Sequence, residues 1–581
     1  MDMVERSSDD AATAAWIHRA TKDEVARQIA EVEDRRRDGA QMPLFGVAFA
    51  VKDNIDVAGM PTTAGCPAFS YVPHRSAAVV ERLVDAGAIV LGKTNLDQFA
   101  TGLVGTRSPY GVPRNPFNER YIPGGSSSGS AVAVARGLAS FALGTDTAGS
   151  GRIPAAFANI VGLKPSRGAL STLGVVPACR SLDCVSIFAL TCEDSWRIFQ
   201  VARRFDPRDP FAREWSVETA PNPRLDAAPF RFGVPADEHL EFFGDNQAAA
   251  LFARAEHALE ALGGRKMHID FSPFRLAARL LYDGPWVAER LLATENLLTT
   301  NPDAIEPTVR AVLSRARGHS AKEVFQAQAE LRLLSRQAEA VFRQVDVMLV
   351  PTAPTLYTVE QVKSDPVRLN SNLGYYTNFV NLLDLCALAV PAGFRTDGLP
   401  FGITLMAPWG QDAGLSGLGA RFHAHASQTL GASTSPHTFE QPTPAANVDP
   451  SGFRLAVVGA HLSGEPLNHQ LTSLGARLVQ TLRTVPSYRL FELAGTTPAK
   501  PGLVRQPAGD GAAIEVEVWC LPDSAVGQFL AGVAAPLCIG SVELASGEWV
   551  HGFLCEQHAV LSAKDISALG GWRAYRKAQG A

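Results

Sequence analysis

The sequence predicts an α/β fold, with a large domain built on a mixed, mostly parallel central sheet covered by helices and a smaller α+β domain after it. Of its 581 residues, 46% are hydrophobic and only 19% are charged, which favours one unusually large buried core. Short apolar runs alternate with helical stretches from about Leu44 onward. A segment nearly free of large apolar residues, 431–452, then divides the chain into two parts.

The first predicted element is a helix over about residues 10–40, where apolar side chains are spaced among many charged ones. Five segments follow in the order expected for strands and helices of one sheet: GVAFAVKDN, AAVVERLVDAG, AIVLGKTN, SAVAVARGLA and FALGTDTAGSG. In such sheets the functional groups collect in loops beyond the strand ends. We therefore look for chemistry where these runs stop.

A long amphipathic helix is predicted from Ser320 to about Gln344, because Ser320 followed by Glu323 resembles a capping box. It leads into an apolar strand, VDVMLVPTAP. The side chains expected on its buried face are Val324, Phe325, Leu331, Leu334, Ala338 and Phe342.

The domain limits follow from the break in composition. Residues 1–430 form the predicted large domain, 431–452 a linker rich in Pro, Ser, Thr and Ala, and 453–581 the second domain. The second domain is long enough to bury its own core. Its expected strands lie in FRLAVVGAHL, AAIEVEVWCLP, LCIGSVELASG and WVHGFLCEQ.

Composition excludes several classes of protein. The formal net charge of −5 provides no global positive field for nucleic acid or an anionic membrane surface. No apolar stretch reaches the length of a membrane span, and the acidic start does not resemble a secretory signal. The eight cysteines include no CxxC pair, so we expect reduced thiols, a cytoplasmic setting and no metal site.

Three segments require an explanation beyond packing. Lys52 directly follows an apolar run, although lysine is almost never fully buried without a partner. Residues 124–130 (GGSSSGS) and 144–152 (GTDTAGSGR) are loops of small residues. Ser126 and Ser150 lie 24 residues apart, enough for a loop, a short helix and a return strand that bring both loops to one edge of the sheet.

These residues suit nucleophilic catalysis by serine. A hydroxyl is a weak nucleophile until a base removes its proton, and Lys52 can be that base if burial lowers its pKa from about 10.4 to about 7 or 8. That shift costs roughly 3 to 5 kcal/mol of stability. Ser126 is the candidate relay between Ser150 and Lys52. The backbone N–H groups of Thr147, Ala148 and Gly149 are candidates for an oxyanion hole.

The motif GGSSSGSAVAVA, with Lys52 upstream and GTDTAGSGRIPAAFANIVGLKPSRG downstream, is similar to the amidase signature family. The resemblance covers about residues 40–410. It implies Lys52 as the base, Ser126 as a relay preceded by a cis peptide bond, and Ser150 as the acyl nucleophile. It implies no cofactor, and it implies a homodimer.

Within the family, TDTAGSGRIP, PFGITLMAP and the segments VVGAHLSGEPLNHQL and IGSVELASGEWVHGFLCE resemble the members that hydrolyse allophanate, a urea carrying a carboxylate. The resemblance implies that Tyr282 and Arg290 hold this substrate, with Arg290 on its carboxylate. Their spacing of eight predicts one shared helix face. The backbone of Gly124 and Gly125 is expected to add contacts to the substrate.

The role of the second domain rests on the same resemblance. His461 in GAHLSG is its best catalytic candidate, with His469 and His551 as weaker ones. A histidine that only satisfies a local hydrogen bond is an equally good interpretation of His461. The resemblance also leaves open an association with an enzyme that degrades urea, or cyanuric acid and biuret.

Three alternatives remain. The same catalytic residues serve a hydrolase of another small amide, such as biuret or an aliphatic or aryl amide. A subunit that delivers ammonia to charged tRNA is disfavoured by the charge of −5 and by the second domain. A catalytically inactive scaffold is disfavoured because Lys52, Ser126 and Ser150 are all present.

Overall fold

The computed structural model describes residues 14–214, 225, 229–427, 429–437, 439, 453–507, 509–521 and 523–579. The described chain forms two compact units, with the main division between Pro442 and Thr443. Residues 440–452 of the predicted linker lie outside the described residues. Its beginning is bound to the first unit, because Gly431 N–H donates to Asn159 O (3.0 Å) and Ala432 N–H donates to Ala135 O (2.9 Å).

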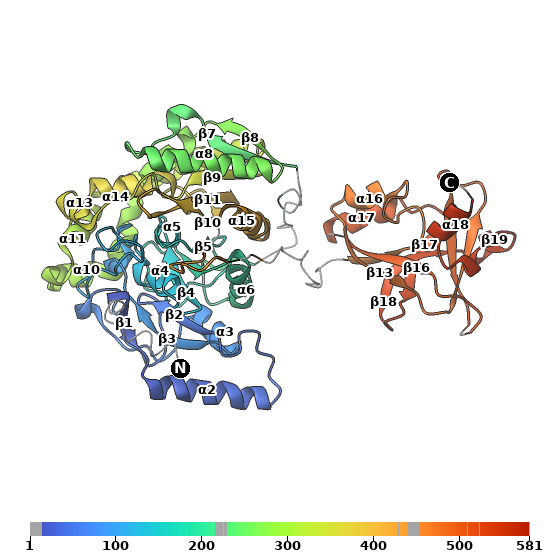
Figure 1. Cartoon of the computed structure of the whole chain (residues 1–581), viewed down its shortest axis with the longest axis horizontal. Helices are drawn as coiled ribbons and strands as arrows, with labels where there is room; N and C mark the ends of the chain where they lie inside the picture. Colours follow the sequence, from blue (N-terminus) through green and yellow to red (C-terminus); the bar gives the residue numbers. More distant parts are fainter. Residues whose placement is uncertain are drawn as a thin grey trace. The chain divides into compact units, whose positions relative to one another are not determined.

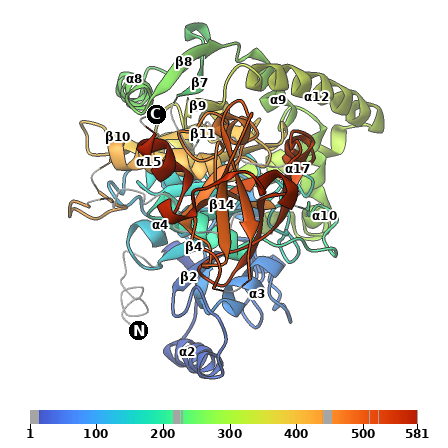
Figure 2. The same ribbon diagram turned by 90° about the vertical axis from the view of Figure 1, so that its right-hand side faces the viewer.

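The first unit is built on an 11-stranded sheet in the order β1-β3-β2-β4-β6-β5-β10-β11-β9-β7-β8 (Figures 1 and 2). Its strands are β1 (Trp16–Arg19), β2 (Ala48–Lys52), β3 (Ile89–Thr94), β4 (Phe141–Asp146), β5 (Val161–Lys164), β6 (Cys184–Ala189), β7 (Phe230–Pro235), β8 (Gly264–Ile269), β9 (Val347–Pro351), β10 (Leu385–Phe394) and β11 (Pro400–Pro408).

The prediction of a mixed sheet is confirmed. Parallel pairing, which we expected to predominate, is confined to two runs, β3-β2-β4 and β9-β7-β8. The pairs between these runs are antiparallel, as is β1 with β3. The difference arises partly from the hairpin of β10 and β11, because strands joined by a short loop pair antiparallel.

The predicted helix over residues 10–40 is wrong in its first half. Trp16–Arg19 is strand β1, and the helix α2 spans Lys22–Arg37. Thr21 sets its start, because Thr21 Oγ1 accepts the Glu24 N–H (3.2 Å) and Glu24 Oε2 accepts the Thr21 N–H (2.7 Å). Residues 10–13 lie outside the described residues.

Helices cover the sheet, as predicted. One group of helices lies along the sheet, and its neighbours pack against each other in the order α3, α6, α15 and α8. Helices α4 and α5 pack together against central strands of the sheet. No helix in the described ranges combines the length and apolar character needed to cross a bilayer. The α-helices of this unit after α2 are α3 (Ala78–Asp85), α4 (Ser128–Ala135), α5 (Ile153–Phe157), α6 (Cys192–Ala202), α8 (Asn246–Ala261), α9 (Ser272–Leu280), α10 (Leu291–Thr300), α11 (Pro307–Arg315), α12 (Ala321–Phe342), α13 (Val359–Ser364), α14 (Arg368–Leu373) and α15 (Asp412–Ala426).

The capping box predicted for the long helix is confirmed, since Ser320 and Glu323 bond reciprocally at the start of α12. The predicted buried face is wrong at Phe325, whose exposed fraction is 70%. The side chains buried on α12 are Ala327, Leu334, Ala338 and Val341. Phe325 does not lie on that stripe, so it faces away from the core.

The second unit has the predicted α+β composition. It contains a 5-stranded sheet, β13-β16-β12-β18-β17, and a 3-stranded sheet, β15-β14-β19. All four segments predicted as strands contain one. The strands are β12 (Phe453–Val457), β13 (Arg477–Arg483), β14 (Tyr488–Leu493), β15 (Lys500–Arg505), β16 (Glu515–Leu521), β17 (Leu537–Glu543), β18 (Trp549–Cys555) and β19 (Lys564–Asp565). The helices are α16 (Asn468–Thr472), α17 (Asp523–Ala531) and α18 (Trp572–Ala578).

Candidate active site

Lys52 is the last residue of β2, which lies between β3 and β4 in a parallel run. The side chain is fully buried, and its Nζ lies 2.8 Å from Ser126 Oγ and 2.7 Å from Thr145 Oγ1. Burial lowers the pKa of Lys52 to about 7, although the charges of Asp97, Asp183 and Asp146 oppose that shift. An amine with this pKa is able to act as a base near neutral pH.

Ser126 follows a tightly packed glycine pair. The Gly125–Ser126 peptide bond is cis, and Gly124 has φ +77°. A Cβ atom at Gly125 would lie 2.1 Å from Asp97 Oδ2, so no larger residue fits there. The Gly125 N–H donates to Leu103 O (2.9 Å). The Gly125 N–H is thus used within the protein, and the backbone contact expected from Gly125 to a substrate stays a prediction.

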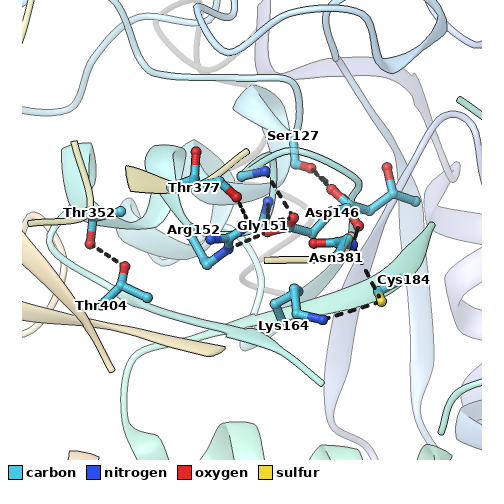
Figure 3. A network of polar contacts seen from close by, with 12 residues as sticks. Ser127, Asp146, Gly151, Arg152, Lys164, Cys184, Thr352, Thr377, Asn381 and Thr404 are labelled. Atoms are coloured by element: carbon cyan, nitrogen blue, oxygen red, sulfur yellow. Dashed lines mark hydrogen bonds and ion pairs between the residues drawn. The ribbon is translucent and has the colours of Figure 1, made fainter. Parts of the chain in front are cut away.

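Ser150 lies in the loop between β4 and α5 and is 3% exposed. The loop is wrapped around the buried carboxylate of Asp146 (Figure 3), which accepts N–H groups from Gly149 (2.9 Å) and Gly151 (3.0 Å). Arg152 binds the same carboxylate through Nε (2.8 Å) and Nη2 (2.9 Å). This fully buried ion pair fixes the backbone on both sides of Ser150.

The predicted oxyanion hole needs a correction at Gly149, because its N–H is donated to Asp146. In the described part of the chain we find no acceptor for the N–H groups of Thr147 and Ala148, so these two remain candidates. Thr147 is itself held in place, because its Oγ1 donates to the buried carboxylate of Asp183.

Tyr282 and Arg290 do not share a helix face. The helix α9 ends at Leu280, and Arg290 closes a separate 3₁₀ helix, η6 (Pro285–Arg290), because Gly284 and Pro285 interrupt the helical run. The two side chains nevertheless meet, with Arg290 Nη2 3.4 Å from Tyr282 Oη and the guanidinium carbon 5.3 Å from the ring centre.

The Arg290 guanidinium is buried, with an exposed fraction of 2%. Its partners are hydroxyl groups, Tyr282 Oη and Thr101 Oγ1 (3.0 Å). Among the described residues it has no carboxylate within ion-pair distance. Its charge contributes to lowering the pKa of Lys52, which places it within electrostatic reach of that amine. A buried cation without a counter-ion suits the binding of an anion.

The three candidate histidines of the second unit have local partners. His461 stacks on Phe553 with ring centres 5.1 Å apart, and its Nε2 lies 3.0 Å from Gln470 Oε1. Burial lowers the pKa of His461. His469 Nδ1 lies 2.9 Å from Pro466 O, and His551 stacks on Phe453 with ring centres 4.8 Å apart.

Comparison with known families assigns both parts of the chain. The Amidase family model matches residues 3–415, and the model of the allophanate hydrolase C-terminal domain matches residues 453–577. The chain belongs to the amidase family. The expected resemblance to that family is thereby confirmed.

Three relatives illustrate this membership. The chain is 44% identical over 575 residues to urea amidolyase of Saccharomyces cerevisiae, covering 97% of this chain and 31% of that protein. It therefore spans about a third of the length of the curated urea amidolyases it matches. A solved structure of Kluyveromyces lactis allophanate hydrolase is 42% identical with a TM-score of 0.88, covering 100% of this chain and 95% of that chain. A glutamyl-tRNA(Gln) amidotransferase subunit from Methanosarcina acetivorans is 32% identical over 443 residues, covering 70% of this chain and 91% of that protein.

Sequence reasoning missed several carboxylates that shape the site of this amidase. Asp97 accepts the N–H groups of Val104 (3.2 Å), Gly105 (2.9 Å) and Arg107 (2.9 Å) beside the glycine pair. Asp146 and Arg152 lie six residues apart on either side of Ser150. An acidic and a basic residue in a loop of otherwise small side chains indicate an ion pair, so the sequence could have predicted this one. Asp97 and Asp183 offered no such signal, because no feature of the surrounding sequence marks them as buried.

Proposed function

We propose that this amidase hydrolyses allophanate, urea-1-carboxylate, to ammonia and carbon dioxide through a serine acyl-enzyme. The observation that carries the proposal is the buried Arg290 guanidinium, whose hydrogen-bond partners among the described residues are hydroxyl groups and which acts electrostatically on Lys52. A neutral amide would leave this cation without a counter-ion. A small urea bearing a carboxylate would supply one beside the reacting carbonyl.

In the proposed reaction Ser150 Oγ attacks the carbonyl carbon of the terminal urea group. Its proton passes through Ser126 to the neutral amine of Lys52, which lies 2.8 Å from Ser126 Oγ. The N–H groups of Thr147 and Ala148 stabilise the oxyanion. The same relay returns the proton to the departing ammonia, and it then activates the water that hydrolyses the acyl-enzyme. Arg290 and Tyr282 hold the carboxylate, and Gly124 borders this site.

The product of this step, N-carboxycarbamate, still has to lose carbon dioxide and ammonia. We infer that the second domain, proposed as 453–581, takes part in that phase with His461 as its candidate catalytic residue. The lowered pKa of His461 supports a neutral imidazole there at pH 7. A His461→Asn variant that releases both equivalents of ammonia at the wild-type rate would remove His461 from this role.

The remaining assignments are proposals of the same kind. We propose a large catalytic domain over 1–430, a linker over 431–452, a homodimer, and a cytoplasmic setting alongside an enzyme that degrades urea, or cyanuric acid and biuret. Light scattering on the purified chain measures the assembly directly. A monomer at micromolar concentration would reject the homodimer.

Ammonia release without ATP tests the main proposal, with allophanate, biuret, urea and propionamide as substrates. We expect the wild-type enzyme to prefer allophanate, Ser150→Ala to be inactive, and Arg290→Ala to lose most allophanate turnover. Arg279→Ala, an exposed arginine on α9, is the matched control and should keep full activity. A wild-type preference for biuret or propionamide would refute allophanate as the substrate.

A further inference from the structure

We propose that Asp183 is a positioning residue that keeps the oxyanion loop, residues 147–149, in register with the Arg290 guanidinium, and so makes the enzyme selective for small ureas that carry a carboxylate. The inference rests on the proposed function, which it extends with a residue that sets the substrate class. Asp183 belongs to a turn of residues 178–183, the bridging turn, that contacts both halves of the proposed substrate site.

The first contact joins the bridging turn to the oxyanion loop. Asp183 directly precedes β6, and at this end of the sheet Cys184 of β6 pairs with Asp146 of β4. The Asp183 carboxylate is therefore next to the start of the serine loop, where it accepts the Thr147 hydroxyl. It also accepts the N–H groups of Ala178 (2.9 Å) and Cys179 (3.1 Å), which closes the turn on itself.

The second contact joins the bridging turn to η6, the element that ends at Arg290. Ser181 donates its N–H (2.9 Å) and its Oγ (2.5 Å) to the carboxylate of Glu289, the residue before Arg290. The Cys179 thiol lies 3.8 Å from Trp286 O in the same helix. One short turn thus holds Thr147 at one end and the neighbour of Arg290 at the other.

This connection matters because, within the described part of the chain, no ion pair fixes Arg290. Its two hydroxyl partners, Thr101 and Tyr282, constrain the guanidinium less than a bidentate carboxylate would. A substrate with a carboxylate at a fixed distance from its scissile carbonyl needs the oxyanion loop and the guanidinium at a matching distance. A misplacement of about 1 Å between them is enough to cost on the order of 10²-fold in rate. A neutral amide uses the oxyanion loop alone.

Four variants test the proposal through the ratio of kcat/KM for allophanate to kcat/KM for propionamide. Thr147→Val removes the hydrogen bond at the oxyanion loop, whereas Asp183→Asn weakens it by removing the charge and one acceptor oxygen, and Glu289→Gln weakens the contact at η6 in the same way. Asp209→Asn is the matched control, because Asp209 is also buried and accepts a threonine hydroxyl and backbone N–H groups, from Thr172 and Phe211, away from this site.

We expect the ratio to fall roughly 10-fold to 100-fold in Asp183→Asn, as the loss of a charge-assisted hydrogen bond implies. Glu289→Gln should lower the ratio in the same direction, mainly through KM for allophanate, and Asp209→Asn should leave it unchanged. An equal loss on both substrates, or no loss, in both Asp183→Asn and Glu289→Gln would overturn the inference. If Asp183→Asn does not fold, Glu289→Gln decides alone. Failure of the proposed function is distinguishable, because it is visible in the wild-type enzyme as the absence of a preference for allophanate.

Discussion

Replacing Lys52 with methionine tests whether this amine is neutral in the folded enzyme. The unfolded chain holds a proton on lysine up to its ordinary pKa of 10.5, whereas burial lowers the pKa in the folded state to about 7. Between these values the unfolded state binds more protons, so the contribution of Lys52 to stability rises with pH. The full penalty, about 5 kcal/mol, applies at pH 7 and below and disappears above the unfolded pKa.

Methionine carries no proton, so a Lys52→Met variant lacks this dependence. We expect its free energy of unfolding, relative to that of the wild type, to decrease by about 1.4 kcal/mol per pH unit from pH 7 to pH 9. Urea titrations of both proteins at pH 7, 8 and 9 measure the difference. If the free energies of unfolding of the two proteins change equally with pH, Lys52 is charged in the folded state and cannot be the base of the proposed relay.

Activity gives a second measure of the same pKa. We expect kcat/KM of the wild type to rise with pH to a plateau, with an apparent pKa near 7. Asp97, Asp183, Asp146 and Arg290 are the charges that act on Lys52. Burial also raises the pKa of Asp183, to about 6. Removing its carboxylate therefore separates the titration of Lys52 from that of Asp183 in the pH profile. Asp183→Asn should move the acid limb to lower pH, because a carboxylate that favours the ammonium form is gone. A limb near pH 10 would contradict the assignment.

Two further predictions concern stability. Arg152→Met leaves the Asp146 carboxylate buried without its cation and should cost about 3 to 5 kcal/mol. Arg208→Met removes a half-exposed arginine from the buried Asp206, which keeps Arg82 as a second cation, and should cost less than about 1 kcal/mol. Equal shifts in melting temperature would contradict this. Phe325→Ser on the exposed face of α12 should change the free energy of unfolding by less than about 0.5 kcal/mol, whereas Leu334→Ala on the buried face should cost about 2 to 5 kcal/mol. Urea titration measures both changes. A large loss of stability in Phe325→Ser would mean that the exposed face is covered.

The sequence was sufficient to predict those parts of the site that depend on local pattern. A lysine at the end of an apolar run marks the end of a buried strand, and loops of small residues mark where backbone must approach closely. The errors arose where a distant partner decides the structure. Trp16–Arg19 is a strand because β3 pairs with it, and Arg290 is placed by Thr101, which lies 189 residues away in the sequence. The Gly149 N–H is taken by Asp146, a contact that depends on the fold of the loop.

The buried cations of the described chain show why Lys52 and Arg290 differ from the rest. The cations buried below 5% exposure are Lys52, Lys93, Arg107, Arg152, Lys164 and Arg290. Lys93 and Arg152 are paired with carboxylates, and Arg107 and Lys164 donate to backbone carbonyl oxygens.

Among the described residues, the hydrogen-bond partners of Lys52 Nζ and of the Arg290 guanidinium are instead side-chain hydroxyl groups. A carboxylate or a carbonyl oxygen can only accept a hydrogen bond. Beside a lysine it therefore stabilises the charged ammonium form, and beside an arginine it occupies the guanidinium N–H groups. A hydroxyl can also donate, so it tolerates a neutral amine at Lys52. At Arg290 it adds no counter-charge, and the Asp183 carboxylate acts on this guanidinium from beyond ion-pair distance. The proposed reaction needs a neutral amine as base and a cation that can bind an anion. Hydroxyl partners allow the first state at Lys52 and the second at Arg290.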